Sequence, residues 1–214
     1  MTLSRLQSFA GWLLLIALGL NLRPLLSSVS PLLNEIRSAT GMSFQSSAWL
    51  TSLPVICMGL VALMGIRLEA RLGERRGIAL GLLLIALACL VRLLLDQAAT
   101  LLATALLGGV GVALIQALVP ALIKRRFTGH VALAMGVYSA SLMGGGGIAA
   151  LLSPHLASHF SHWQAGLGIW LLPALAALLL WWWMPVSGMR NTNVAAPGEA
   201  LSRQRRAWTL ALYF

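Results

Sequence analysis

The sequence predicts an all-α integral membrane protein, a six-helix bundle, and three observations carry this prediction. Of the 214 residues, 59% are hydrophobic and only 9% are charged, and the mean hydropathy is +0.86. These values are far from those of a water-soluble domain. Apolar runs recur at about the 20 residues that a helix needs to cross a bilayer. Basic residues gather between alternate pairs of these runs, as they do in the loops of membrane proteins.

Six apolar runs are long enough to span the membrane, and each is predicted to form one helix. They cover residues 9–33, 46–66, 77–95, 98–122, 131–154 and 163–184. The tryptophans at 181–183 support the last boundary, because an amphipathic indole ring favours the headgroup region. We therefore expect a bundle over residues 1–184, a cytoplasmic loop over 185–207 and the start of a truncated seventh helix over 208–214.

The positive charges predict the orientation of the bundle. Most of the 15 Lys and Arg residues fall before the first run, after the last, or in the loops that follow the second and fourth runs. Cytoplasmic loops keep such residues, so both ends of the chain are predicted to be cytoplasmic. The net charge of +10 then reflects topology and attraction to anionic lipid. We expect the bilayer as a partner and no nucleic acid.

Small residues recur at every fourth position in two of the runs, which places each set on one helix face. We predict that both faces are seams where helix backbones approach closely. The residues are Ala105, Gly109, Ala113, Ala117 and Ala121 in the fourth run, and Ala132, Gly136, Ala140 and Gly144 in the fifth.

The run MGGGG, at 143–147, is unusual because each glycine weakens a helix by about 0.5–1 kcal/mol relative to alanine. Close packing alone and a bend used in a working cycle are the two alternatives. The predicted hinge positions are Pro24, Gly144, Gly145, Gly146 and Gly147.

Arg23 is predicted to lie deep in the first span, about 21 Å along the helix from residue 9. An arginine in hydrocarbon costs about 2.5–3.5 kcal/mol on insertion scales, so its environment must offset that cost. One alternative is that its tip snorkels to the outer headgroups. The other is that its guanidinium faces a water-filled cavity and binds an anion, for which a planar set of donors is suited.

Two features of the neighbouring sequence favour anion binding by Arg23. Ser27 and Ser30 follow four and seven residues later and extend a polar stripe on the same helix face. Pro24 leaves the carbonyl of Leu20 without its usual partner, which favours a kink. We therefore predict a substrate site that contains Arg23 and Ser27.

Two further polar residues within the predicted spans could donate to the same solute. Gln116 lies in the fourth run and Tyr138 in the fifth, although such side chains more often bond a neighbouring helix. Arg92 lies near the outer end of the third run and is expected to snorkel. All five acidic residues fall at span ends or in loops, so we expect no buried carboxylate and a net positive interior that attracts small anions.

Metal and cofactor sites are not predicted. His155, His159 and His162 repeat at a spacing that could place imidazoles on one face, but zinc would need a further ligand or water. An enzyme is not expected either, because the serines in YSAS lack both the glycine-flanked setting and a histidine from another helix that a membrane serine protease would use.

The loop GIRLEARLGERRG, at 65–77, resembles the G-x-x-x-D-R-x-G-R-R motif between the second and third helices of the major facilitator superfamily. It departs in two places, since the acid at Glu69 lies one residue farther from the second glycine and Glu74 replaces a basic residue. The predicted conformational-loop residues are Gly65, Glu69, Arg71, Gly73 and Arg75.

The segments LGLNLRPLLSSVSPLL, GMSFQSSAWLTSLPVICMG, ALLGGVGVALIQALVPALIKRRF and YSASLMGGGG extend the resemblance. Together they resemble the N-terminal half of the cyanate transporter family of this superfamily. The resemblance implies twelve helices in two halves that rock around a midplane site. It also implies a small anionic solute and a C-terminal half as partners. Efflux of drugs or other organic solutes, and a non-transporting fragment that needs its other half, remain the alternatives.

Overall fold

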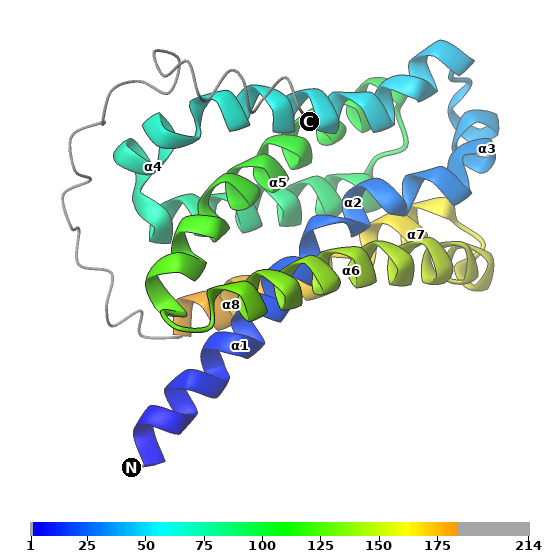
Figure 1. The fold of residues 1–214 in the computed structure, drawn as a ribbon. Coiled ribbons are helices and arrows are strands. Elements are labelled where there is room, and N and C mark those ends of the chain that lie inside the picture. The colour runs from blue at the N-terminus through cyan, green and yellow to red at the C-terminus, as the bar shows by residue number, and fades with distance from the viewer. Residues whose placement is uncertain (1, 184–214) are drawn as a thin grey trace.

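The computed structural model describes residues 2–183, and all regular elements within that range are helices (Figure 1). Six stretches of the described chain are long and apolar enough to cross a membrane, which confirms the predicted multi-pass bundle. They are Phe9–Thr40, Phe44–Met64, Arg71–Leu94, Ala98–Arg126, Val131–Phe160 and Trp163–Trp183. The loop predicted over 185–207 and the helix start over 208–214 lie outside the described residues.

The first span is interrupted at its centre. It consists of α1 (Thr2–Leu22), α2 (Pro24–Ser27) and α3 (Val29–Thr40), with Arg23 at the first break. The break is where Pro24 removes a backbone N–H, and the Arg23 carbonyl accepts from the amides of Leu26 at 3.0 Å and Ser27 at 2.9 Å. Continuous α-helix therefore gives way to a short turn at the position of the arginine.

The first span also ends later than predicted. Its last helix, α3, continues to Thr40, beyond the expected end at residue 33, because its polar final turns remain helical until a glycine stops them. Gly41 takes the left-handed conformation, with φ of 68°, and its N–H bonds the Arg37 carbonyl at 2.9 Å. A glycine in this conformation is a common helix terminator.

The second and third spans form one long helical element, α4 (Phe44–Leu94), which turns back on itself at Gly73 (Figure 1). Gly73 has φ of 68° and ψ of 159°, a backbone conformation that is essentially restricted to glycine. The second arm of α4 then runs beside α5 (Ala98–Arg126). This turn explains why the loop motif needs a glycine at position 73.

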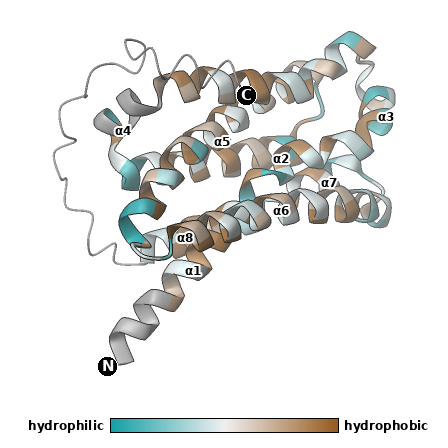
Figure 2. Ribbon diagram, viewed as in Figure 1, coloured by the Kyte–Doolittle hydropathy of each residue, from teal (hydrophilic) through white to brown (hydrophobic). Residues whose placement is uncertain are grey.

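The remaining helices complete the bundle. α6 (Val131–Phe160) packs mainly along α1, and the last span is divided into α7 (Trp163–Gly168) and α8 (Leu171–Trp183), which pack against α4. Hydrophobic residues dominate the helices, and the turn between α5 and α6 is among the polar segments at one end of the bundle (Figure 2). That turn lies at the same end as the N-terminus and the turn of α4 (Figure 1).

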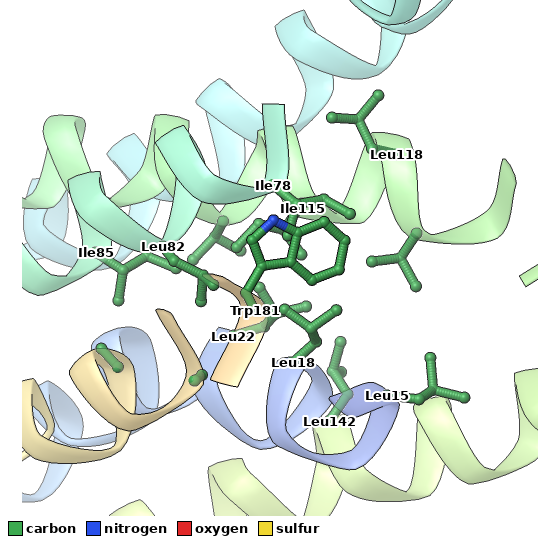
Figure 3. Packing of buried hydrophobic residues seen from close by; sticks show 14 of the residues in the cluster. Leu15, Leu18, Leu22, Ile78, Leu82, Ile85, Ile115, Leu118, Leu142 and Trp181 are labelled. Carbon is green, nitrogen blue, oxygen red and sulfur yellow. The ribbon is translucent and has the colours of Figure 1, made fainter. Parts of the chain in front are cut away.

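Trp181 lies at the centre of the main hydrophobic core, where leucine and isoleucine side chains from α1, α4, α5 and α6 surround its ring (Figure 3). It is 1% exposed, and its Nε1 donates to the Arg75 carbonyl at 3.1 Å. The headgroup position predicted for this ring is therefore wrong. Trp182 and Trp183 are 70% and 85% exposed, because successive helical residues point about 100° apart.

The two stripes of small residues have different environments. In α5, the first three residues of the stripe, Ala105, Gly109 and Ala113, are buried, which confirms a packing seam there, and the last two are half-buried. The stripe of α6 is exposed from Ala132 to Gly144, so the predicted seam on that face is wrong for the described residues. The physical reason is that α6 uses another face for packing, the one that carries Gly145 and Gly146.

Candidate functional site

Arg23 lies near the middle of the 32-residue span Phe9–Thr40, at the break between α1 and α2. Its side chain is half-buried, and its Nε is enclosed by protein and has no hydrogen-bond partner within the described residues. No carboxylate of the described chain forms an ion pair with it. A buried donor without a partner loses about 1–3 kcal/mol of solvation, so the Nε of Arg23 is an unsatisfied donor in the middle of the span.

Gly146 of α6 lies against the same segment. A Cβ at Gly146 would be 3.1 Å from Ser27 Oγ and 3.2 Å from Arg23 Cβ. The structure therefore places Arg23 and Ser27 on one face, toward α6, as the spacing of four residues predicts. Ser30 is exposed and lies beyond the second break, at Ser28.

The neighbouring Gly145 brings the α6 backbone onto the carbonyl that Pro24 leaves unpaired. A Cβ at Gly145 would overlap the Leu20 carbonyl oxygen and lie 2.9 Å from the carbonyl carbon. One turn earlier along α6, Ser141 makes a similar contact with α1, because a Cβ at Gly19 would lie 2.7 Å from Ser141 Cβ. Helices α1 and α6 thus meet almost backbone to backbone beside the arginine, because glycine carries no side chain at these positions.

The four-glycine run divides into two pairs with different surroundings. Gly145 and Gly146 are buried in the contact with α1 and α2, whereas Gly144 and Gly147 face open space. The helix is continuous through all four from Val131 to Phe160. Close packing accounts for the inner pair, and the hinge role of the run stays a prediction.

The other two predicted site residues lie in different places. Tyr138 is on the buried face of α6, 7% exposed, and its hydroxyl has no hydrogen-bond partner among the described residues. Its backbone carbonyl borders Gly19 on the same α1–α6 contact that carries Arg23. Gln116 is half-buried on α5, which packs chiefly against α4. The structure therefore groups Arg23, Ser27 and Tyr138 along one contact and leaves Gln116 on another helix pair.

Arg92 is a further residue that sequence reasoning misplaced. The expectation that it snorkels is wrong, because its side chain is 1% exposed and turns into the bundle. Its Nε donates to Thr104 Oγ1 at 3.0 Å, and its Nη1 donates to the Leu25 carbonyl at 2.9 Å. A long side chain near the end of a span can point either to the headgroups or into the bundle. Only the neighbouring helices therefore decide where the Arg92 side chain lies.

The loop motif is partly described. Gly73 forms the turn of α4, and Arg71 and Arg75 are exposed. The predicted positions Gly65 and Glu69 fall in the range 65–70, whose side chains lie outside the described set. Glu74 is 5% exposed, and its Oε1 pairs with Arg125 Nη1 at 3.0 Å. The expectation of no buried carboxylate is therefore wrong, since the acid that departs from the motif joins the turn of α4 to the end of α5.

The sequence model of the Major Facilitator Superfamily matches residues 9–214. The chain belongs to the major facilitator superfamily. This is a family of transporters, and membership agrees with the six spans of the described residues and with the glycine turn of the loop motif.

Three curated transporters are similar to this chain. The cyanate transport protein CynX of Escherichia coli (strain K12) is 48% identical over 204 residues, which cover 94% of this chain and 53% of that protein. The 2-nitroimidazole transporter of the same organism is 30% identical over 195 residues, which cover 90% and 49%. The uncharacterized transporter YycB of Bacillus subtilis (strain 168) is 30% identical over 215 residues, which cover 98% and 52%. The chain spans about half the length of the curated relatives it matches.

Proposed function

We propose that this chain is the N-terminal half of a secondary transporter that moves a small anion, with cyanate as the first choice, across the bacterial inner membrane by alternating access. The observation that carries the proposal is the half-buried Arg23 at a helix break in mid-span, whose Nε has no hydrogen-bond partner among residues 2–183. The similarity to the cyanate transport protein supports the same charge of solute. The C-terminal half is the partner that completes the site.

The chemistry of a guanidinium suits such a solute. It presents several N–H donors in one plane, and hydrogen bonds between a charged donor and an anion are roughly twice as strong as neutral ones. Ser27 Oγ lies on the same face and can add a hydroxyl donor. A small monovalent anion would supply the counter-charge that no carboxylate of the described chain supplies, which offsets part of the cost of keeping Arg23 in the membrane.

The interruption of the first span gives this site a means to move. Substrate sites of secondary transporters commonly lie at discontinuous helices near the midplane, where one bundle rocks against the other. Pro24 lies on one side of the contact between the first span and α6, and Gly145 and Gly146 lie on the other. Bending at Pro24 or within the glycine run 144–147 would shift Arg23 relative to α6. In this proposal the glycine run serves both as a packing surface and as a hinge.

The proposed orientation has the N-terminus in the cytoplasm. The exposed basic residues Arg71, Arg75, Lys124 and Arg125 gather at the end of the bundle that holds the N-terminus, and cytoplasmic loops concentrate such charges. Labelling of a single cysteine in place of Thr128, in the turn after α5, tests this in intact cells. Modification of this cysteine by a membrane-impermeant reagent without permeabilisation would show the opposite orientation.

The decisive experiment uses the full-length transporter in proteoliposomes with labelled cyanate, with and without a proton gradient. Arg23→Ala is expected to abolish uptake while the amount of inserted protein stays unchanged. Arg23→Lys is expected to retain little, because a point charge replaces a planar fork. Arg37→Ala, on the outer part of the same span, is the matched control and is expected to transport normally.

Two outcomes would contradict the proposal. Normal uptake by Arg23→Ala would remove the binding role of this residue. Transport of 2-nitroimidazole by the wild-type protein, with no cyanate uptake, would assign the chain to the solute named for its relative of 30% identity.

A further inference from the structure

Arg92 is a cation that is buried inside the bundle although it lies close to the end of its span. It lies two residues before the end of the third span, where its side chain could reach the headgroups. It turns inward instead and is 1% exposed. Removing a guanidinium from water is unfavourable unless hydrogen bonds replace its hydration. The partners that it reaches therefore show what the inward conformation serves.

Those partners belong to two other spans. Arg92 Nε donates to Thr104 Oγ1 at 3.0 Å, and the Thr104 hydroxyl itself donates to the Leu101 carbonyl at 2.8 Å. This second bond fixes the hydroxyl so that its lone pairs are available to the arginine. Arg92 Nη1 donates to the Leu25 carbonyl at 2.9 Å. One side chain thus joins the first, third and fourth spans.

The Leu25 carbonyl is in the short helix α2, between Arg23 and Ser27. The Leu25 side chain is also held, because a Cβ at Gly108 of α5 would lie 2.8 Å from Leu25 Cδ1 and 3.1 Å from Ala88 Cβ. On its other side, α2 meets Gly146 of α6. The segment that carries the proposed anion site is thus held between two contacts, and Arg92 makes the hydrogen bond on the α4–α5 side.

We propose that Arg92 is a positioning residue for the anion site, which sets the placement of Arg23 and Ser27 through its hydrogen bond to the Leu25 carbonyl. This inference rests on the proposed function of Arg23. Thr104 acts through Arg92 by orienting its guanidinium. Because an interrupted helix lacks part of its own hydrogen-bond ladder, an external donor to its backbone restricts where the segment can lie.

The first test measures uptake of labelled cyanate over a range of concentrations in the full-length transporter. Arg92→Met is expected to raise the half-saturating concentration about ten- to a hundredfold, the change expected from losing a charged hydrogen bond, with a smaller change in maximal rate. Thr104→Val should act in the same direction but more weakly, because the bond to Leu25 remains. The double variant should equal Arg92→Met, since Thr104 acts through Arg92. Arg37→Met is the matched control.

The second test needs no transport, so it separates this inference from the proposed function. In a full-length background with Cys57→Ala and Cys89→Ala, the labelling rate of Ser27→Cys by a small neutral maleimide is measured. Arg92→Met is expected to change that rate several-fold and to leave Ser139→Cys, on the exposed face of α6, unchanged. If Arg92→Met fails to insert, Thr104→Val is measured in the same way.

The outcomes are distinct. An unchanged half-saturating concentration together with an unchanged labelling rate at position 27 would overturn the positioning role, as would a loss of maximal rate alone. A changed labelling rate in a protein that transports no anion would support positioning of α2 and reject the proposed solute.

Discussion

Helices α5 and α6 carry the same sequence pattern and put it to different use. Each has small residues at every fourth position, yet the α5 stripe is buried over its first three residues, where Gly109 meets α4, and the α6 stripe is exposed. A Cβ at Gly109 of α5 would lie 2.6 Å from Pro54 Cα, whereas nothing lies within 4 Å of a Cβ at Gly136 or Gly144 of α6. The pattern permits a close approach of backbones, and the rest of the fold decides whether one occurs.

The difference also separates two functions of glycine within α6. Gly145 and Gly146 make contact with the broken first span beside Arg23, while Gly144 on the neighbouring face has open space. One helix therefore offers a packed face to its own bundle and a second face of small residues away from it. Under the proposed function, the second face is available to the C-terminal half. Substitutions on the two faces can test this division.

The largest expected effect is in the seam of α5. Gly109→Leu would place a branched side chain where the first atom already overlaps the Pro54 backbone, so the two helices must separate. Overpacking of this kind costs about 1–3 kcal/mol, and more where the obstacle is backbone. The midpoint of thermal unfolding in detergent should fall by several degrees. Gly136→Leu, in open space on α6, is the control, and an equal fall in both variants would erase the distinction between the stripes.

A smaller effect is expected at the contact with the first span. Gly145→Ala adds one methyl group against the Leu20 carbonyl, which can move only with the break at Arg23. We expect a loss of stability of about 1–2 kcal/mol and a reduced rate of uptake in the full-length transporter. Thermal unfolding and uptake measured on the same preparation test this. An unchanged unfolding midpoint would show that α6 does not approach α1 as closely as described.

The smallest effect is expected on the open face of α6. Gly144→Ala should stabilise the bundle by about 0.5–1 kcal/mol, because alanine favours the helix and nothing obstructs its methyl group. The unfolding midpoint should rise slightly. A fall in stability of the full-length transporter would instead show that another part of that protein packs on this face.

The spans could be predicted from the sequence because hydrocarbon leaves few solutions. Backbone groups in a membrane must bond within their own segment, so a long apolar run becomes a helix whatever surrounds it. The break at Arg23 was predictable for a similar local reason, since Pro24 removes a hydrogen bond of its own helix. The sharing of a face by Arg23 and Ser27 follows from their spacing along that helix.

The residues whose positions the sequence predicted wrongly share one property, which is their place along the spans. Trp181, Arg92 and Glu74 all lie near span ends, where a long side chain can turn either toward the headgroups or into the bundle. The sequence favoured the headgroups for Trp181 and Arg92, and the structure buries both. Partners from distant segments decide the matter: the Arg75 carbonyl for Trp181, Thr104 and Leu25 for Arg92, and Arg125 for Glu74.

The sequence alone therefore determined what depends on near neighbours along the chain, namely the six spans of the described residues, the interruption of the first one and the polar face that follows it. The tertiary structure decided which side chains are buried at the span ends, which of two similar stripes is packed, and which cation holds α2 in place. The physical reason is that a helix in lipid satisfies its own backbone, whereas a side chain at its surface gains or loses free energy according to the helix that lies opposite.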